Sequence, residues 1–370
     1  MKKRIPTKNG SFGSAKAMIK PAPGKNFDVI AIGGITEDIM FYVEDMKVLK
    51  NPNKFGSKTL LAFEDGNKII SDQQVVYTGG GGGANTAISF ARLGLKTGLI
   101  AALGQDQTAV SSLNKLSKEK INTSFIKQFK GSWSGLSLVV TGKNQDEHII
   151  FSHRAANEKL KIKAGDYKKL KTKWFYLASL SGPFWKSNLK EIFALAAEKN
   201  SLLAWNPGTA QIREGVEFLK PYFKKTDVLI VNREEAISLC LSKGKKLNQI
   251  KNLLVTLTDF GPSIVAISNG DKGAWVINKS STFLQGIKPC KKVLDKGQIY
   301  FEPGLPVKVV NSTGAGDAFG SSLIGGLILY KNNIVQALKL ALIRSSMVVT
   351  KVGAQEALLK IVEVNSKYKI

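Results

Sequence analysis

The chain has 370 residues, 43% hydrophobic and 22% charged, which is ordinary for a globular protein with a large buried core. Its 54 Lys and Arg residues against 28 Asp and Glu give a net charge of +26, but the lysines are spread along the chain and form no Arg-rich patch with aromatic residues, so we expect no nucleic-acid partner. No apolar run is long enough to cross a bilayer and no apolar segment follows the N-terminal MKKR, so we expect a cytoplasmic protein that does not enter a membrane.

The N-terminal region divides into a tail and a first strand. Residues 1–26 contain seven Lys and Arg among Pro, Gly and Ser, which predicts a flexible basic tail before a domain over residues 27–370. Residues 27–34 read FDVIAIGG, a pattern typical of a buried parallel strand. Asp38 follows the carboxyl end of this strand, where open α/β sheets bind ligands.

The next region predicts a peripheral sheet and a glycine-rich helix start. Residues 40–78 favour two or three antiparallel strands outside the main sheet, and residues 133–152 alternate in the manner of a hairpin. The five glycines of 79–83 precede a helical pattern that Gly94 ends. These glycines and Asp106 also fit a dinucleotide fingerprint, but a five-glycine run satisfies almost any glycine pattern, so we do not favour an NAD-dependent enzyme.

Short apolar strands alternate with helical patterns over roughly 200 residues of the chain. This alternation predicts an α/β fold with a doubly wound, mostly parallel sheet flanked by helices. Polar loops follow three of the strands and begin at residues 205, 231 and 268. The sequence contains no GxxxxGK[ST] motif, so a phosphate would have to be bound by other means than a P-loop.

The segment 309–326 reads VVNSTGAGDAFGSSLIGG and predicts such a phosphate site. We expect a strand ending at Val310, a turn over 311–313 and a helix from Ala318 onward. Glycines before a helix leave N–H groups free to bind an anion, and Asp317 lies where it could accept a proton beside a phosphate. A tight turn capped by Asp317 is the simpler alternative, but the run of small residues after it favours the anion site.

Two segments, GGGGANTAISFARLG and NSTGAGDAFGSSLIGG, occur in the order and spacing of one family. Over about residues 27–355 the chain resembles the PfkB/ribokinase family of carbohydrate and nucleoside kinases. The resemblance implies a ribokinase-like fold with a small β lid at about 40–78 and 133–152, which would exclude water from the acceptor. It also implies ATP- and Mg²⁺-dependent transfer of the γ-phosphate to a primary hydroxyl of a sugar, as in ribokinases and fructokinases.

Two other functions and one assembly stay open. The acceptor could be a nucleoside of the adenosine type, or the chain could be a PfkB-like binding or regulatory protein with little catalysis. The lid strands also permit a homodimer.

The resemblance assigns roles residue by residue. The anion hole and base would be formed by Gly314, Ala315, Gly316 and Asp317. The acceptor would be held by Asp38, Gly80, Gly81, Asn85 and Arg154. The nucleotide would contact Asn232, Ser268, Gly270, Gly273, Thr313 and Gly353. Mg²⁺ would be organised through water by Asn232 and Glu235, although Asn-x-x-Glu is also an ordinary helix-capping pattern.

The chain departs from the family pattern at two positions. Asn311 stands where the family usually has Asp, which leaves a potassium site without one anionic ligand. Gly82 stands where true ribokinases usually have Lys, and this difference weakens the assignment of free ribose as the acceptor. The segment 349–355, VTKVGAQ, resembles the family segment beside the adenine and the monovalent-cation loop.

Overall fold

The computed structural model describes residues 26–44, 46–50, 59–71, 73–142, 148–279, 297–368 and 370. The predicted basic tail, except Asn26, lies outside the described residues, as does the turn at 143–147 in the predicted hairpin.

A nine-stranded sheet forms the centre of the molecule, in the order β15-β14-β13-β12-β11-β10-β1-β6-β7. Neighbouring strands from β7 to β13 are parallel, and β14 is antiparallel to both of its neighbours. The strands are β1 Asn26–Ile32, β6 Thr97–Leu103, β7 Ile126–Gln128, β10 Lys171–Leu177, β11 Leu202–Trp205, β12 Val228–Asn232, β13 Ile264–Ser268, β14 Ala274–Asn278 and β15 Gln298–Glu302. This arrangement confirms the predicted doubly wound, mostly parallel sheet.

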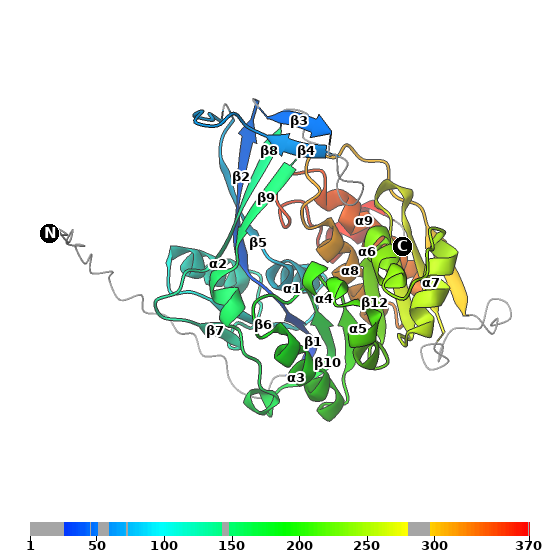
Figure 1. Ribbon diagram of the computed structural model, residues 1–370. Helices are drawn as coiled ribbons and strands as arrows, with labels where there is room; N and C mark the ends of the chain where they lie inside the picture. Colours follow the sequence, from blue (N-terminus) through cyan, green and yellow to red (C-terminus); the bar gives the residue numbers. More distant parts are fainter. Residues whose placement is uncertain are drawn as a thin grey trace.

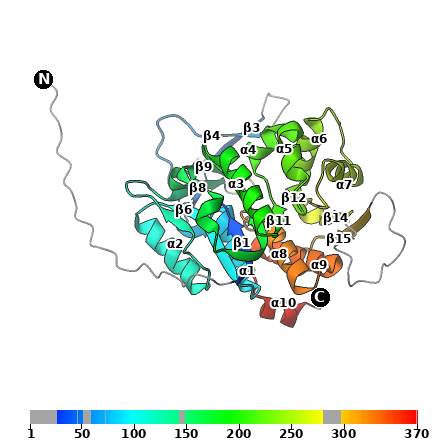
Figure 2. The ribbon, with the colours of Figure 1, turned by 90° about the horizontal axis from the view of Figure 1, so that it is seen from below.

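Helices cover both faces of this sheet (Figures 1 and 2). One face packs on α3 Trp185–Glu198, α4 Thr209–Arg213, α5 Gly215–Phe223, α6 Arg233–Leu241 and α7 Ile250–Asp259. The other packs on α1 Gly82–Arg92, α2 Gln107–Lys118, α8 Ala315–Leu329, α9 Ile334–Val348 and α10 Ile361–Lys367. Among the described residues no helix combines the length and apolar character that a membrane crossing requires.

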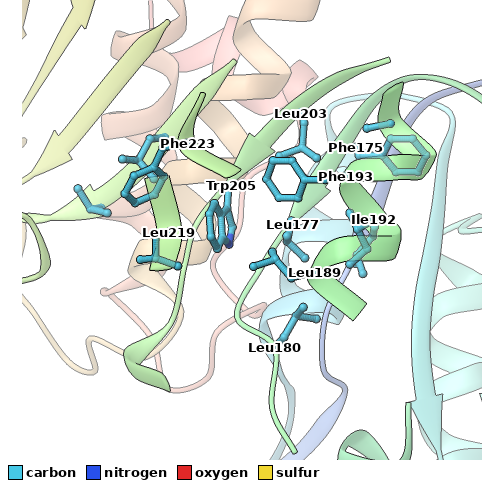
Figure 3. Packing of buried hydrophobic residues seen from close by; sticks show 14 of the residues in the cluster. Phe175, Leu177, Leu180, Leu189, Ile192, Phe193, Leu203, Trp205, Leu219 and Phe223 are labelled. Atoms are coloured by element: carbon cyan, nitrogen blue, oxygen red, sulfur yellow. The ribbon is translucent and has the colours of Figure 1, made fainter. Parts of the chain in front are cut away.

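Strand alternation sends side chains to the two cores. On β10, Phe175 and Leu177 join the core under α3 and α5, whereas Trp174 and Tyr176 face the α8 side. Figure 3 shows the first core, where Trp205 of β11 lies between side chains of α3 and α5. Both faces of the central strands are therefore buried, which explains their continuous apolar sequences.

A second sheet of four strands, β5-β2-β8-β9, projects from the main body (Figure 1). It consists of β2 Thr36–Val43, β5 Val76–Gly80, β8 Gly135–Gly142 and β9 His148–His153, and a two-stranded sheet adds β3 Lys47–Lys50 and β4 Thr59–Ala62. The predicted hairpin at 133–152 is confirmed, because β8 and β9 pair antiparallel. β2 and β8 pair in parallel, which the prediction of antiparallel strands did not include.

Asp38 follows the carboxyl end of β1, as predicted, and lies within β2. Two local predictions were wrong. The strand predicted to end at Val310 is absent from the described part of the chain. β15 ends at Glu302, and the two prolines of the following PGLP cannot donate hydrogen bonds to a neighbouring strand. The helix predicted from Ala318 begins at Ala315, so Asp317 lies inside its first turn.

Candidate active site

Two helices begin side by side at one pocket, and their N-termini differ in how they are capped. At α6, the Asn232 side chain accepts from the Glu235 N–H at 2.8 Å, and the Glu235 carboxylate accepts from the Asn232 N–H at 2.9 Å. At α8 the capping residue is Gly314, which adopts φ +82° and has no side chain to cap the helix. α6 therefore satisfies its own N-terminus, whereas α8 leaves donors for a ligand.

The pocket between these helix starts has a volume of about 210 Å³. Its lining residues are Asn206, Ile230, Val231, Asn232, Glu235, Ser268, Gly314, Gly316, Asp317 and Phe319. The structure thus brings together predicted residues from three distant parts of the chain. No role was predicted from sequence for Asn206, although this residue lies in a polar loop expected at the carboxyl end of a strand. None was predicted for Phe319 either, which lies in the predicted small-residue helix.

Asp317 faces the pocket and contacts α1. Its Oδ2 accepts a hydrogen bond from Asn85 Nδ2 at 2.8 Å. Burial raises the pKa of Asp317, the Asn85 bond lowers it and the negative charge of Asp38 raises it further. The Asp317 carboxyl is therefore a better proton acceptor than an ordinary aspartate, which suits a general base.

Asp38 is 5% exposed and is the second carboxylate of the site. Its Oδ1 accepts from Thr36 Oγ1 at 2.8 Å, and burial raises its pKa while the positive charge of Arg154 opposes the rise. A Cβ on Gly80 would lie 2.0 Å from Asp38 Oδ2, so a larger residue there would displace the Asp38 side chain. Gly81 adopts φ +87° and a Cβ on it would lie 2.5 Å from the Gly34 carbonyl oxygen, so both predicted glycines permit a close approach.

The return from the lid is tied to the junction between β1 and β2. Asn157 accepts from the Ile35 N–H at 3.0 Å and donates to the Ile35 carbonyl at 2.8 Å. Arg154 is exposed and begins the short turn that carries Asn157. The prediction that Arg154 contacts an acceptor stays a prediction, but its charge acts on Asp38.

The residues at α6 fit a role beside hydrated Mg²⁺. Asn232 and Glu235 line the pocket, and the capping bond to the Asn232 N–H uses only Oε2 of the Glu235 carboxylate. The described residues contain no group of three or more His, Cys, Asp or Glu side chains placed to hold a metal. Mg²⁺ keeps several waters and is commonly held by one or two carboxylates and substrate phosphates, and this donor set matches that pattern.

Of four other residues that were predicted to contact nucleotide, one lines the pocket and three do not. Ser268 lines the pocket, but Gly270, Gly273 and Gly353 are not among its lining residues. A Cβ on Gly273 would lie 2.2 Å from the Glu302 carbonyl oxygen, and one on Gly353 would lie 2.8 Å from the Thr78 side-chain methyl Cγ2. Gly273 therefore packs closely on backbone, whereas Gly353 packs closely on a side chain.

Asn311 and Thr313 form the turn before α8. The Asn311 Oδ1 accepts from the Thr313 N–H at 3.0 Å, an Asx-type turn that leads into Gly314. The predicted contact of Thr313 with nucleotide stays a prediction.

Known proteins resemble this chain over most of its length. The profile of the pfkB family carbohydrate kinases matches residues 53–361. The ribokinase of Dictyostelium discoideum is 27% identical over 311 residues, which are 80% of this chain and 90% of that protein.

Two solved structures share the fold. The Burkholderia thailandensis nucleoside kinase in complex with inosine has a TM-score of 0.70 at 16% identity, covering 92% of this chain and 97% of that one. The ribokinase of Cryptococcus neoformans var. grubii serotype A in complex with ADP has a TM-score of 0.69 at 20% identity, covering 92% and 100%. With the family profile spanning most of its length, the chain belongs to the pfkB family of carbohydrate kinases and is a phosphotransferase.

Proposed function

We propose that the protein transfers the γ-phosphate of ATP to a primary hydroxyl of a sugar. One observation carries this proposal: the uncapped start of α8 and the carboxylate of Asp317 face the same pocket. An anion site beside a proton acceptor is the arrangement that phosphoryl transfer to a hydroxyl requires.

The reaction would proceed by in-line displacement. The acceptor oxygen forms a bond to the γ-phosphorus while the bond from that phosphorus to the leaving ADP oxygen breaks, and Asp317 takes the hydroxyl proton. The N–H groups of Gly316 and Asp317 at the start of α8 would stabilise the charge on the transferred phosphoryl group, whereas the Ala315 N–H donates to the Ser312 carbonyl at 3.3 Å. No covalent enzyme intermediate is needed, because positioning and charge stabilisation supply the catalysis.

Mg²⁺ would lie near Asn232 and Glu235, where it neutralises phosphate charge when bound. Burial raises the pKa of Glu235, and its bond from the Asn232 N–H opposes the rise. The two hydrogen bonds of the capping box hold the Glu235 side chain in one orientation at the edge of the pocket.

The acceptor would lie between Asp317 and the lid. Asp38 is held on β2 close to Asp317, and its negative charge raises the pKa of Asp317. An ionised carboxylate accepts hydrogen bonds from hydroxyl groups, so Asp38 suits a polyol. The lid sheet carries Asp38 and would shield the transfer from water.

A nucleoside is the second candidate acceptor, and Gly82 favours it. A Cβ on Gly82 would lie 3.3 Å from Asp317 Oδ1 and 3.2 Å from Ala178 Cβ, so a bare backbone at this position keeps space beside the base. The structurally similar Burkholderia kinase was solved with inosine.

An acceptor screen tests the proposal and separates its two forms. ADP release from ATP would be measured with ribose, fructose, adenosine and inosine as acceptors. Turnover on a free sugar supports the proposal, and turnover confined to the nucleosides replaces it with the alternative. Absence of turnover on every sugar and nucleoside would refute both.

The role of Asp317 is tested by Asp317→Asn, which keeps the side-chain shape but cannot take a proton. We expect kcat to fall by about 10²–10⁴-fold, whereas the ATP dissociation constant, measured by calorimetry, should change little. Substantial turnover in this variant would show that another group accepts the proton.

A further inference from the structure

Gln355 makes a side-chain contact that the sequence did not predict. The segment 349–355 resembles the family segment beside the adenine and the monovalent-cation loop, and in the structure the Gln355 side chain is 1% exposed and contacts α1. Its Nε2 donates to Asn85 Oδ1 at 2.7 Å, and Asn85 Nδ2 donates to Asp317 Oδ2 at 2.8 Å. Three side chains thus form a hydrogen-bonded chain that ends on the proposed base.

The direction of these hydrogen bonds matters. The two ends of an Asn amide have the same shape but opposite roles, since the oxygen accepts and the nitrogen donates. Because Gln355 donates to Oδ1, the Asn85 amide presents Nδ2 to Asp317. A reversed Asn85 would place its oxygen against the carboxylate oxygen, and two acceptors would face each other.

Gln355 does not share the face of β5 that Asp38 occupies. A Cβ on Gly79 would lie 2.9 Å from Gln355 Oε1, and a Cβ on Gly80 would lie 2.0 Å from Asp38 Oδ2. Successive residues of a strand face opposite sides, so Gln355 and Asp38 lie on opposite sides of β5. Gln355 therefore acts on the site through Asn85.

The backbone of Gln355 is held from α1. Arg92 Nη1 donates to the carbonyls of Gln355 at 2.6 Å and Leu358 at 3.0 Å, and Arg92 is ion-paired with Glu119 at 2.6 Å. The buried Oε1 of Gln355 accepts no hydrogen bond from the part of the chain that is described. An unsatisfied buried oxygen is unfavourable, and the bond that the Gln355 nitrogen donates offsets part of this cost.

We propose that Gln355 is a positioning residue that fixes the Asn85 amide so that Asn85 donates a hydrogen bond to the Asp317 carboxylate. The proposal rests on the proposed function, in which Asp317 accepts the proton.

The chain of hydrogen bonds has a consequence for titration. The titratable group that shifts the pKa of Asp317 is Asp38 from β2, whereas the charge of Asp317 in turn raises the pKa of the Tyr176 phenol from β10. Burial and Asp38 raise the Asp317 pKa, and the Asn85 bond lowers it. Without Gln355 the Asn85 bond no longer lowers the Asp317 pKa, so Asp317 is protonated at a higher pH. The acid limb of the pH profile of kcat therefore moves to higher pH.

Two substitutions test this. Gln355→Met keeps the length and removes the amide. Gln355→Glu keeps the shape, and its ionised carboxylate is an acceptor, which favours an Asn85 amide turned with its nitrogen away from Asp317. We expect kcat to fall about tenfold in Gln355→Met and further in Gln355→Glu, with the ATP KM within about twofold of the parent. The acid limb should move up in both, and an NMR titration of the Asp317 carboxyl should show the same shift without turnover.

Two controls make the test specific. Gln211 is also 1% exposed and donates through Nε2 to the Leu180 carbonyl at 2.8 Å, so Gln211→Met removes a buried glutamine amide without touching Asn85; its acid limb should stay in place. In an Asn85→Ala background, Gln355→Met should cause no further loss of kcat, because its effect passes through Asn85.

An unshifted acid limb in Gln355→Met, or losses that add in the double variant, would overturn the inference. That outcome is distinct from failure of the proposed function, which would appear as no turnover in the parent or as full turnover in Asp317→Asn.

Discussion

The two carboxylates of the site are held where water is scarce, and neighbouring glycines make room for them. Asp38 fills the space beside Gly80, and Asp317 lies beside Gly82. Burial raises the pKa of both carboxyls, and the charge of Asp38 raises that of Asp317. Keeping two carboxylates ionised in this position costs stability, and these two carboxylates are the proposed acceptor-binding and base groups.

This cost predicts that Asp38→Asn raises the stability of the protein while lowering its activity on the acceptor. The folded-state pKa of Asp38 is raised, so the folded state favours the protonated form, and stability is lost as pH rises from the ordinary aspartate pKa through the raised value. At pH 7 the neutral amide avoids this loss, and we expect the melting temperature to rise by about 2 °C. The gain should shrink as pH falls toward 4, and kcat/KM for the acceptor should drop.

Calorimetric melting at pH 7 and pH 4 checks this prediction. Glu64→Gln in the exposed ion pair with Lys47 is the control, since solvent-exposed pairs contribute little. A lower melting temperature for Asp38→Asn at pH 7 would contradict the interpretation.

At the scale of elements, the site depends on how α1 and α8 are joined. Arg344 of α9 is fully buried and donates to Ser89 Oγ of α1 at 2.7 Å and to Ser322 Oγ of α8 at 2.8 Å. Ser321 Oγ also donates to Ser89 Oγ at 2.6 Å. These bonds hold together two helices far apart in sequence, and Asn85 and Asp317 lie at their N-terminal ends.

The start of α8 yields a prediction from two neighbouring glycines. Gly314 adopts φ +82° and a Cβ there would lie 2.3 Å from Ala354 Cβ, whereas a Cβ on Gly316 meets nothing within 4 Å. Gly314→Ala should destabilise the protein by about 1–3 kcal/mol. Gly316→Ala should keep or slightly raise stability, because alanine favours a helix, yet it places a methyl group at the pocket and should raise the ATP KM.

Chemical denaturation and ATP kinetics on the two variants separate these effects. Equal loss of stability in both would show that the positive φ and the contact with Ala354 do not govern the start of α8.

At the scale of the molecule, the sheet determines where the site forms. The chain runs from β1 through the lid to β6 and β7 on one side, then returns to β10 and continues to the other edge (Figure 1). The strand order therefore reverses beside β1, and ligands of open α/β sheets bind in the crevice at such a point. Asp38, Asn85 and Asp317 meet there.

The net charge of +26 belongs to the same scale. A positive field attracts anionic nucleotides and is screened by salt. Raising NaCl from about 50 to 500 mM should increase the ATP KM several-fold while the KM of a neutral sugar changes less than about twofold. An equal change in both constants would mean that salt acts on the fold or the lid and not on nucleotide attraction.

Much of the architecture is determined by local sequence. The apolar strands, the intervening helices and the GAGD helix start are readable because burial on both faces, helical periodicity and glycine conformation leave local signals. The strand expected before Asn311 was wrong because β-branched residues alone do not provide a pairing partner, and the prolines that precede them interrupt the ladder.

Tertiary structure alone decided which distant groups meet. The parallel pairing of β2 with β8, the pocket position of Asn206 and the contact of Gln355 with Asn85 join residues from separate parts of the chain. The Asn232–Glu235 pattern was ambiguous in sequence, and the structure shows a capping box that also lines the pocket. Sequence determines local conformation, whereas the direction of the hydrogen bonds that reach Asp317 depends on packing between α1, α8 and residue 355, which no local pattern encodes.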